Sequence, residues 1–231
     1  MFLFSLSPAL HAQGDLSIII HPVFNGKPLL LNEGQYITGT GDTITIEEFR
    51  FYMSHPRMIN QEYVYHEEKS YHLPDASDSL SLHFVINRIP SGHYSSFDFM
   101  IGVDSMASVS GAMDGALDPT LGMYWAWNTG YINAKLTGHS PVCKTLHHAF
   151  EFHIGGYLPP YQTIRKVSLP VDLNISSGKT SSLDIDADVA VWFRNIRLFA
   201  LNNVVIPSKE AMKIADNYME MFSVSKPNET K

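Results

Sequence analysis

Hydrophobic and polar residues alternate with a period of two along much of the chain. Such alternation predicts β-strands with one buried and one wet face, an arrangement that antiparallel sheets permit. The longest run covers residues 183–193, in which Asp184, Asp186 and Asp188 lie opposite the apolar positions. Three further runs comprise Leu82, Phe84 and Ile86; Phe97, Phe99, Ile101 and Val103; and Val167, Leu169, Val171, Leu173 and Ile175.

Turn signals separate these runs, as at Asn25-Gly26, Gly155-Gly156 and Ser177-Gly178. Helical spacing occurs only near the end, behind the N-cap candidate Ser208. We therefore predict an all-β fold, an antiparallel Greek-key-type β-sandwich with a short C-terminal α-helix. One domain is expected over residues 13–224, and residues 225–231 are expected to form a disordered tail. The apolar helix positions are Ala211, Ile214, Ala215, Tyr218 and Phe222.

Charge and terminal sequence narrow the class of protein. The formal net charge is −7, from 16 Lys and Arg against 23 Asp and Glu, which disfavours a nucleic-acid partner. Residues 1–12 are interpreted as the end of a secretory signal peptide, although no basic residue precedes Lys27. Residues beyond this leader contain no apolar run of the roughly 18 to 20 residues that spans a membrane. The lone Cys143 excludes an internal disulfide framework. We expect an exported protein.

The segment from 115 to 133 combines two Trp, two Tyr, a Met and three Gly. This density of aromatic and glycine residues indicates a shaped site rather than generic core packing. Met123, Trp125 and Trp127 lie at i, i+2 and i+4, so an extended chain points all three side chains the same way. Thioether and imidazole groups suit a soft ion such as Cu(I) better than carboxylate oxygens do.

Two histidines stand next to turns. His21 closes the apolar run LSIIIH, and His153 precedes the Gly155-Gly156 pair in FEFHIGG. Alternation puts His153 opposite Phe150, Phe152 and Ile154, where a ligand can reach it. A single strand histidine is more often hydrogen-bonded or solvated than metal-binding. The presence of the Trp-rich segment in the same chain favours a ligand role for His21 and His153.

Two other groups of residues have simpler explanations than a metal site, and enzyme motifs are absent from the sequence. Cys143, His147 and His148 resemble part of a blue-copper ligand set, but no Met follows at short spacing. Carboxylates around a glycine-rich connection could hold Ca²⁺, although aspartates close turns without any ion. No nucleophile elbow, zinc-protease motif or nucleophile and base pair is present, so we expect no enzyme. The carboxylates in question are Asp104, Asp114 and Asp118.

The order of several motifs resembles the MbnP-like copper-binding family, named after the methanobactin-associated periplasmic protein. The resemblance covers nearly the whole chain after the leader. Its motifs are LSIIIHPVFNGKPL, FRFYMS at 49–54, IPSGHYSSFDFMIGVDS at 89–105, GALDP at 115–119, GMYWAWNTGYIN at 122–133, FEFHIGG at 150–156, LDIDADVAVWF at 183–193 and KIADNYMEMF.

The resemblance implies a non-catalytic β-sandwich that binds Cu(I) in the periplasm or at the cell surface. In some relatives a partner dihaem peroxidase oxidises a Trp to kynurenine, which assists copper binding alongside His. Carried onto this chain, His21 and His153 are the candidate imidazole ligands, Met123 is a thioether neighbour, and Trp125 or Trp127 is the residue open to modification. The alternative is a metal-free binding module of the same family, in which the Trp-rich segment is structural.

Overall fold

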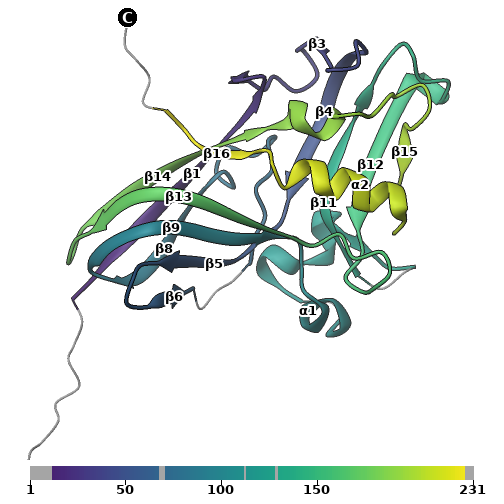
Figure 1. Cartoon of the computed structure of the whole chain (residues 1–231). Coiled ribbons are helices and arrows are strands. Elements are labelled where there is room, and N and C mark those ends of the chain that lie inside the picture. The colour runs from purple at the N-terminus through teal and green to yellow at the C-terminus, as the bar shows by residue number, and fades with distance from the viewer. Residues whose placement is uncertain (1–11, 68–70, 112, 128–129, 227–231) are drawn as a thin grey trace, which may run out of the picture.

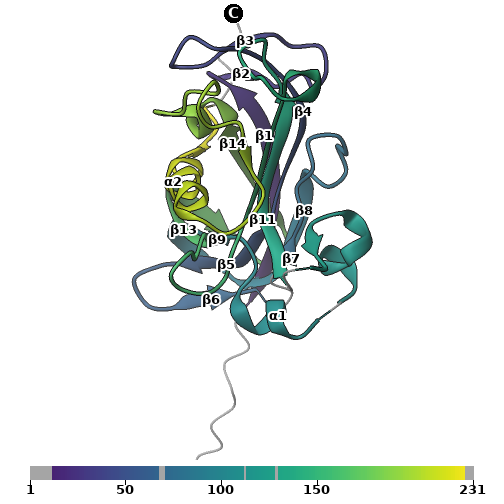
Figure 2. The same ribbon diagram turned by 90° about the vertical axis from the view of Figure 1, so that its right-hand side faces the viewer.

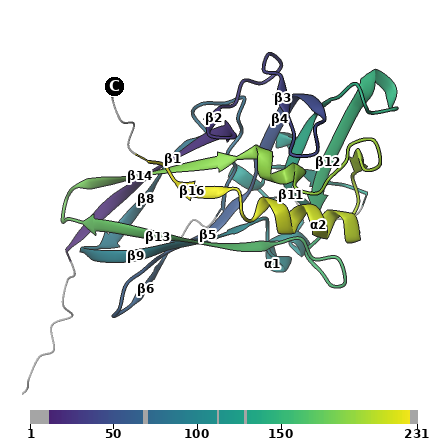
Figure 3. The same ribbon diagram turned by 45° about the horizontal axis from the view of Figure 1, so that its top comes forward.

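Three β-sheets contain the predicted strands and share one hydrophobic core. A computed structural model describes residues 12–67, 71–111, 113–127 and 130–226 of the chain. The predicted class, a mostly-β sandwich with a short C-terminal helix, is confirmed. Figure 1 shows α2 (Lys209–Tyr218) lying near β11 and β12, and Figure 3 shows the long β13 and β14 converging at the opposite end.

The first sheet has the order β16-β14-β1-β2, and β8 also pairs with β1, on the side away from β14. Its central pair, β1 with β14, is parallel, whereas the sequence predicted antiparallel pairing. Strands this far apart in the chain can run parallel because the connection between them crosses the molecule. Leu16, Ile18 and Ile20 of β1 point into the core. The strands are β1 (Gln13–Phe24), β2 (Lys27–Pro28), β8 (His83–Pro90), β14 (Thr180–Asp188) and β16 (Phe222–Val224).

The second sheet has the order β15-β12-β11-β4-β3, with the short β10 beside β11. Phe49, Phe150 and Phe152 turn inward from it. Their alternate neighbours face outward, and this outer face carries the candidate site described below. The strands are β3 (Tyr36–Ile37), β4 (Thr43–Phe51), β10 (Tyr124–Trp125), β11 (Gly130–His139), β12 (Ala149–Gly155) and β15 (Asn203–Val204).

The third sheet has the order β13-β9-β5-β6, with β7 beside β5. The core joins the three sheets through aromatic rings. Phe222 of β16 lies 5.2 Å from Phe51 of β4 and 5.0 Å from Phe99 of β9, between ring centroids, so one side chain touches all three sheets. The strands are β5 (Met53–Ile59), β6 (Val64–His66), β7 (Tyr71–His72), β9 (Gly92–Ile101) and β13 (Arg165–Ile175).

Helices are few and short among the described residues. The Ser208 hydroxyl accepts from the Ala211 amide and caps α2, as predicted. Neither α-helix has the length and apolar character needed to cross a membrane. The remaining helices are α1 (Ser105–Val109) and the 3-10 turns η1 (Gly115–Leu117), η2 (Pro119–Leu121), η3 (Leu146–His148) and η4 (Val189–Phe193).

The strand predicted over 183–193 ends early. β14 stops at Asp188, and 189–193 form η4 instead. The Asp188 carboxylate accepts from the Ala190 amide and caps this turn, which ends the extended backbone. Val189, Trp192 and Phe193 are buried there, a spacing that alternation does not predict.

The two predicted end segments lie largely outside the described residues. Of the leader 1–12, only Ala12 is described, and of the tail 225–231, only Ser225 and Lys226. Ser225 is held against β14, because its amide donates to the Asp184 carbonyl and its hydroxyl to the Asp186 carboxylate.

Asp98 on β9 is a buried carboxylate, with its side chain 1% exposed. Burial alone raises its pKa, but hydrogen bonds from Lys166, Ser168 and Ser96 outweigh that effect and leave the pKa below its ordinary value. Ionised Asp98 therefore stabilises the folded protein at pH values above about 3.9, the pKa of an aspartate in the unfolded chain. This stabilisation is lost as the pH falls through the lower pKa that Asp98 has in the folded protein.

We expect Asp98→Asn to lower the unfolding free energy by about 1–3 kcal/mol at pH 7, because Lys166 and Arg57 lose their charged acceptor. The difference in unfolding free energy between wild type and variant should become smaller below about pH 4. Urea unfolding at both pH values measures this. Asp172→Asn on β13, where the side chain is 91% exposed, is the control and should change little. A gap that does not depend on pH would contradict the account.

Candidate metal centre

A row of three polar side chains crosses the outer face of the second sheet. In the strand register Lys135 of β11 pairs with Arg50 of β4 on one side and with His153 of β12 on the other. Residues directly opposite each other in a sheet share a face, so the three side chains are neighbours. Phe152 and Ile154 point into the core, which puts His153 on the outside as predicted.

The charges around His153 are paired with one another. The Lys135 ammonium lies 3.0 Å from one Glu48 oxygen, and the Arg50 guanidinium lies 2.8 Å from the other. Arg50 also contacts Asp75 at 3.0 Å. All four side chains are at most about one quarter exposed. Each cation therefore has a carboxylate partner, and the row presents little net charge to a ligand at His153.

Residues 104–111 and 113–127, which we call the cap segment, cover the end of this outer face. Figure 2 shows α1 and the turns after it beside β7 and β11. The Arg50 guanidinium donates to the Leu121 carbonyl at 2.9 Å, and the Tyr131 hydroxyl donates to the Leu117 carbonyl at 2.8 Å. These two hydrogen bonds, the pairing of β10 with β11 and the contact of Trp125 with Gly155 fix the cap segment to the sheet.

The indole of Trp125 packs on Gly155. A Cβ built on Gly155 would lie 2.6 Å from Cζ3 of Trp125, so only glycine leaves room for the ring. Gly155 is two residues beyond His153 on the same strand and therefore shares its face. The structure accordingly brings Trp125 to the part of the sheet that carries His153.

Met123 and Trp125 belong to one small apolar cluster, and both side chains are buried there. Trp127 lies next to them, with ring centroids 5.6 Å from Trp125, but is 65% exposed. The other members of this cluster are Tyr52, Val103, Ala107, Leu117, Tyr131 and Ile132. Trp125 also lines a cavity of ≈ 230 Å³ together with Gly130, Gly156, Tyr157 and Tyr161. A thioether, two indoles and an open cavity therefore gather at this edge of the sheet.

The environment of His153 favours its neutral form. Burial lowers the pKa of His153 below its ordinary value, and the positive charge of Lys135 lowers it further. The charges of Glu151 and Glu48 act in the opposite direction but do not cancel the shift. Since neutral imidazole is the form that coordinates metals, His153 is in the protonation state that a ligand needs at neutral pH.

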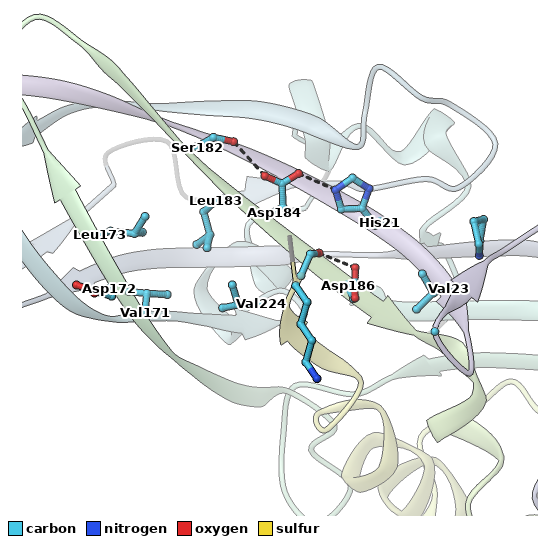
Figure 4. A pocket seen from close by; sticks show the side chains of 14 residues that line it. His21, Val23, Val171, Asp172, Leu173, Ser182, Leu183, Asp184, Asp186 and Val224 are labelled. Carbon is cyan, nitrogen blue, oxygen red and sulfur yellow. Dashed lines mark hydrogen bonds and ion pairs between the residues drawn. The ribbon is translucent and has the colours of Figure 1, made fainter. Parts of the chain in front are cut away.

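His21 lies in another sheet with other partners. It sits on β1, where its Nε2 is 2.8 Å from a carboxylate oxygen of Asp184, and the side chain is 44% exposed. The groove that it lines shares no residue with the cavity beside Trp125 (Figure 4). The structure thus packs Trp125 on the His153 strand, with Met123 and Trp127 beside Trp125, and does not group His21 with them. Within the described ranges no three His, Cys, Asp or Glu residues are arranged to hold a metal.

The aspartates considered for Ca²⁺ form local hydrogen bonds. Asp104 accepts from the amides of Met106 and Ala107 and caps α1, while its other oxygen contacts His55 and Tyr71. Asp118 accepts from the amide and hydroxyl of Thr120 and caps η2. Capping explains these two carboxylates without an ion.

The Cys143 cluster has no blue-copper geometry. The thiol is buried and points at the Leu198 carbonyl at 4.0 Å. His148 uses Nδ1 to donate to the Cys143 carbonyl oxygen, not to the sulfur. Burial raises the pKa of the Cys143 thiol, which disfavours the thiolate that copper requires.

Sequence reasoning missed the charged neighbours of His153. Lys135 follows five buried residues in β11, and a lysine within the apolar run YINAKL was the available signal. Glu48 and Arg50 alternate with buried Phe49 and Phe51, so their outward direction was also readable. Their convergence with Lys135 depends on pairing between distant strands, which no local pattern reports.

Taken together, the molecule is a three-sheet β-sandwich in which a Trp-rich cap segment packs on the strand that carries His153 on its outer face. A sequence model of the MbnP family matches residues 13–212. The chain belongs to the MbnP family. Among solved structures it is similar to MbnP from Methylosinus trichosporium, with 14% identity, a TM-score of 0.51, and coverage of 84% of this chain and 80% of that one. At this identity the likeness shows a shared fold. No curated protein matches the chain by sequence.

Proposed function

We propose that this protein is exported to the periplasm or cell surface and there binds Cu(I) as a carrier or store, without catalysis of its own. Membership of the MbnP family supports a copper-related role. The single observation that carries the proposal is the packing of Trp125, from the buried cluster that also holds Met123, on Gly155, two residues beyond His153 on β12. Neutral imidazole and thioether are donors that Cu(I) prefers.

In this proposal His153 supplies the principal ligand, and Met123 with Trp125 forms a dry wall that excludes water and hard oxygen ligands. Trp127 is the more accessible indole because most of its surface is exposed. Oxidation of Trp125 or Trp127 to kynurenine by a partner dihaem peroxidase would add a further donor group at the same edge. His21, which lies in another sheet, is proposed as a second imidazole ligand that is separate from the His153 site.

A metal-free binding module is the second candidate function. It is favoured by one observation, that the described residues contain no group of three or more His, Cys, Asp or Glu arranged around a common point. The cap segment would then serve to complete the fold, and the cavity beside Trp125 would contact a ligand other than a metal.

Metal analysis separates the two candidates. We expect protein purified from its native host, and protein loaded with Cu(I) under anaerobic conditions and then desalted, to retain about one copper per chain. Zn²⁺ loaded in the same way should be lost, because a site with one imidazole and a thioether suits the softer ion. Intact mass of the native protein, followed by mass analysis of the fragment with Trp125 and Trp127, tests the modification. Copper that is lost on desalting would favour the metal-free module.

A further inference from the structure

β13 and β14 follow one another in the chain but belong to different sheets. A short turn over 176–179 joins them, yet β13 pairs with β9 and β14 pairs with β1. The two strands therefore diverge from the turn (Figure 3). β16 lies on the free side of β14 and pairs with Ile185–Ala187 only, at the end far from the turn. Between the turn and β16, the space beside β14 has no strand in the described part of the chain.

This space is part of a groove of ≈ 700 Å³, which we call the β13–β14 groove and which continues past β14 to His21, Val23 and Pro28. Figure 4 shows Val171, Asp172 and Leu173 on one side, Ser182, Leu183 and Asp184 on the other, and Val224 of β16 between them. The register of β13 shifts between Pro170 and Leu173, so its edge is irregular at the point where the groove opens. Val224 marks the end of the strand that partly fills it.

The free edge of β14 has backbone groups aimed into the groove. The Asp184 carbonyl accepts from Ser225 on this side. Alternate residues of a strand direct their amide and carbonyl to the same side, so the backbone of Ser182 faces the groove as well. The free edge from Thr180 to Leu183, before the bond at Asp184, is about 13 Å long at 3.3–3.4 Å per residue. Exposed edges of this kind are templates for an added strand.

The side chains at the groove select for charge. Asp172, Asp184 and Asp186 line it, whereas Lys226 is the one Lys or Arg among its lining residues. Val171 and Leu173, which are partly buried, provide apolar surface beside these carboxylates. The net charge of the chain, −7, adds a long-range attraction for cations. A second copy of this chain would bring like charges together, which is unfavourable.

We propose that the β13–β14 groove binds an extended, basic segment of a partner protein, which adds to the free edge of β14 in line with β16. The backbone of the segment bonds to Ser182 and its neighbours, as in β-strand addition. Alternate side chains of the segment face the apolar surface at Val171 and Leu173 and the carboxylates of Asp184 and Asp186. The inference does not depend on copper, since His21 is the one lining histidine and lies outside the His153 region.

The test uses the full chain and two labelled seven-residue peptides, one alternating Lys and Val and one alternating Glu and Val. Fluorescence anisotropy at low ionic strength should show the Lys peptide binding at least about tenfold tighter, with affinity falling as salt is added. Asp184→Lys should weaken it about five- to tenfold, as two unit charges change at the groove. Glu62→Lys, an equal change near the opposite edge of the third sheet, should have little effect.

Ser182→Pro separates strand addition from simple charge attraction. It removes an amide that faces the groove and leaves the bonds to β1 in place, so we expect about a fivefold loss of peptide affinity. Circular dichroism and thermal unfolding establish that the variant is folded, and Ser182→Ala is the matched control. Equal binding of both peptides, or affinity unchanged in both Asp184→Lys and Ser182→Pro, would overturn the proposal. A dimer dispersed by the peptide in sedimentation would assign the groove to a second copy and overturn it too.

Discussion

His153→Ala is expected to weaken Cu(I) binding by roughly 100-fold or more while leaving the fold intact. Loss of groups that only orient a metal ligand already costs 10–100-fold in affinity, and loss of the ligand itself should cost at least that. The side chain lies on the outer face of β12, so its removal opens no cavity in the core. Competition against a Cu(I)-specific chromogenic chelator measures the affinity, and thermal unfolding confirms the fold.

The matched controls are His21→Ala and His93→Ala. Both residues are strand histidines hydrogen-bonded to an aspartate, His21 to Asp184 and His93 to Asp172. Neither lies on the second sheet, so we expect each variant to keep at least about half of the wild-type affinity. Unchanged affinity in His153→Ala would discard this ligand. A loss in His21→Ala as large as that in His153→Ala would place the copper between the two imidazoles, contrary to their separation in different sheets.

Local patterns predicted most of the strands and the C-terminal helix. Alternation is a property of neighbouring residues, so the buried faces of 97–103 and 167–175 could be read directly. The error at 189–193 has a local cause too. Asp188 was counted as one of three solvent-facing aspartates, but its carboxylate caps a turn and changes the spacing of the buried residues that follow.

The same local patterns did not predict which strands pair with one another. The parallel contact of β1 with β14 joins residues about 165 positions apart, as in the pair His21 and Asp186. Alternation shows which way a side chain points, but not which strand lies beside it. For this reason His21 and His153 were placed beside one site, although the sheet order separates them.

The sequence predicted part of the candidate site. The spacing of Met123 and Trp125 predicted a shared face, and both side chains are indeed buried in one cluster. The position of Gly155 after His153 predicted a turn, whereas its role is to accept the Trp125 ring. A glycine in a sequence indicates either a flexible backbone at a turn or the close approach of another group to the backbone. Only the packed structure distinguishes these two roles.

Gly155→Val is expected to have the largest effect on stability, lowering the unfolding free energy by about 3 kcal/mol. A Cβ at this position would lie 2.6 Å from the Trp125 ring and 2.7 Å from the Tyr131 carbonyl oxygen. The ring can move only by leaving the cap cluster, and the carbonyl belongs to the neighbouring strand. For a chain of this size the loss corresponds to a fall in melting temperature of about 6–12 °C. Thermal unfolding measures it.

The same substitution links stability to the proposed copper site. Displacement of Trp125 should expose its indole, shift its fluorescence to longer wavelength in a Trp127→Phe background, and weaken Cu(I) binding at least about tenfold, because the wall beside His153 is lost. Gly39→Val is the control, since a Cβ at Gly39 meets no atom within 4 Å. A Gly155→Val protein as stable as the Gly39→Val control would show that Trp125 is not held on β12. Full copper affinity in a Gly155→Val protein with displaced Trp125 would show that His153 binds the metal without the aromatic wall.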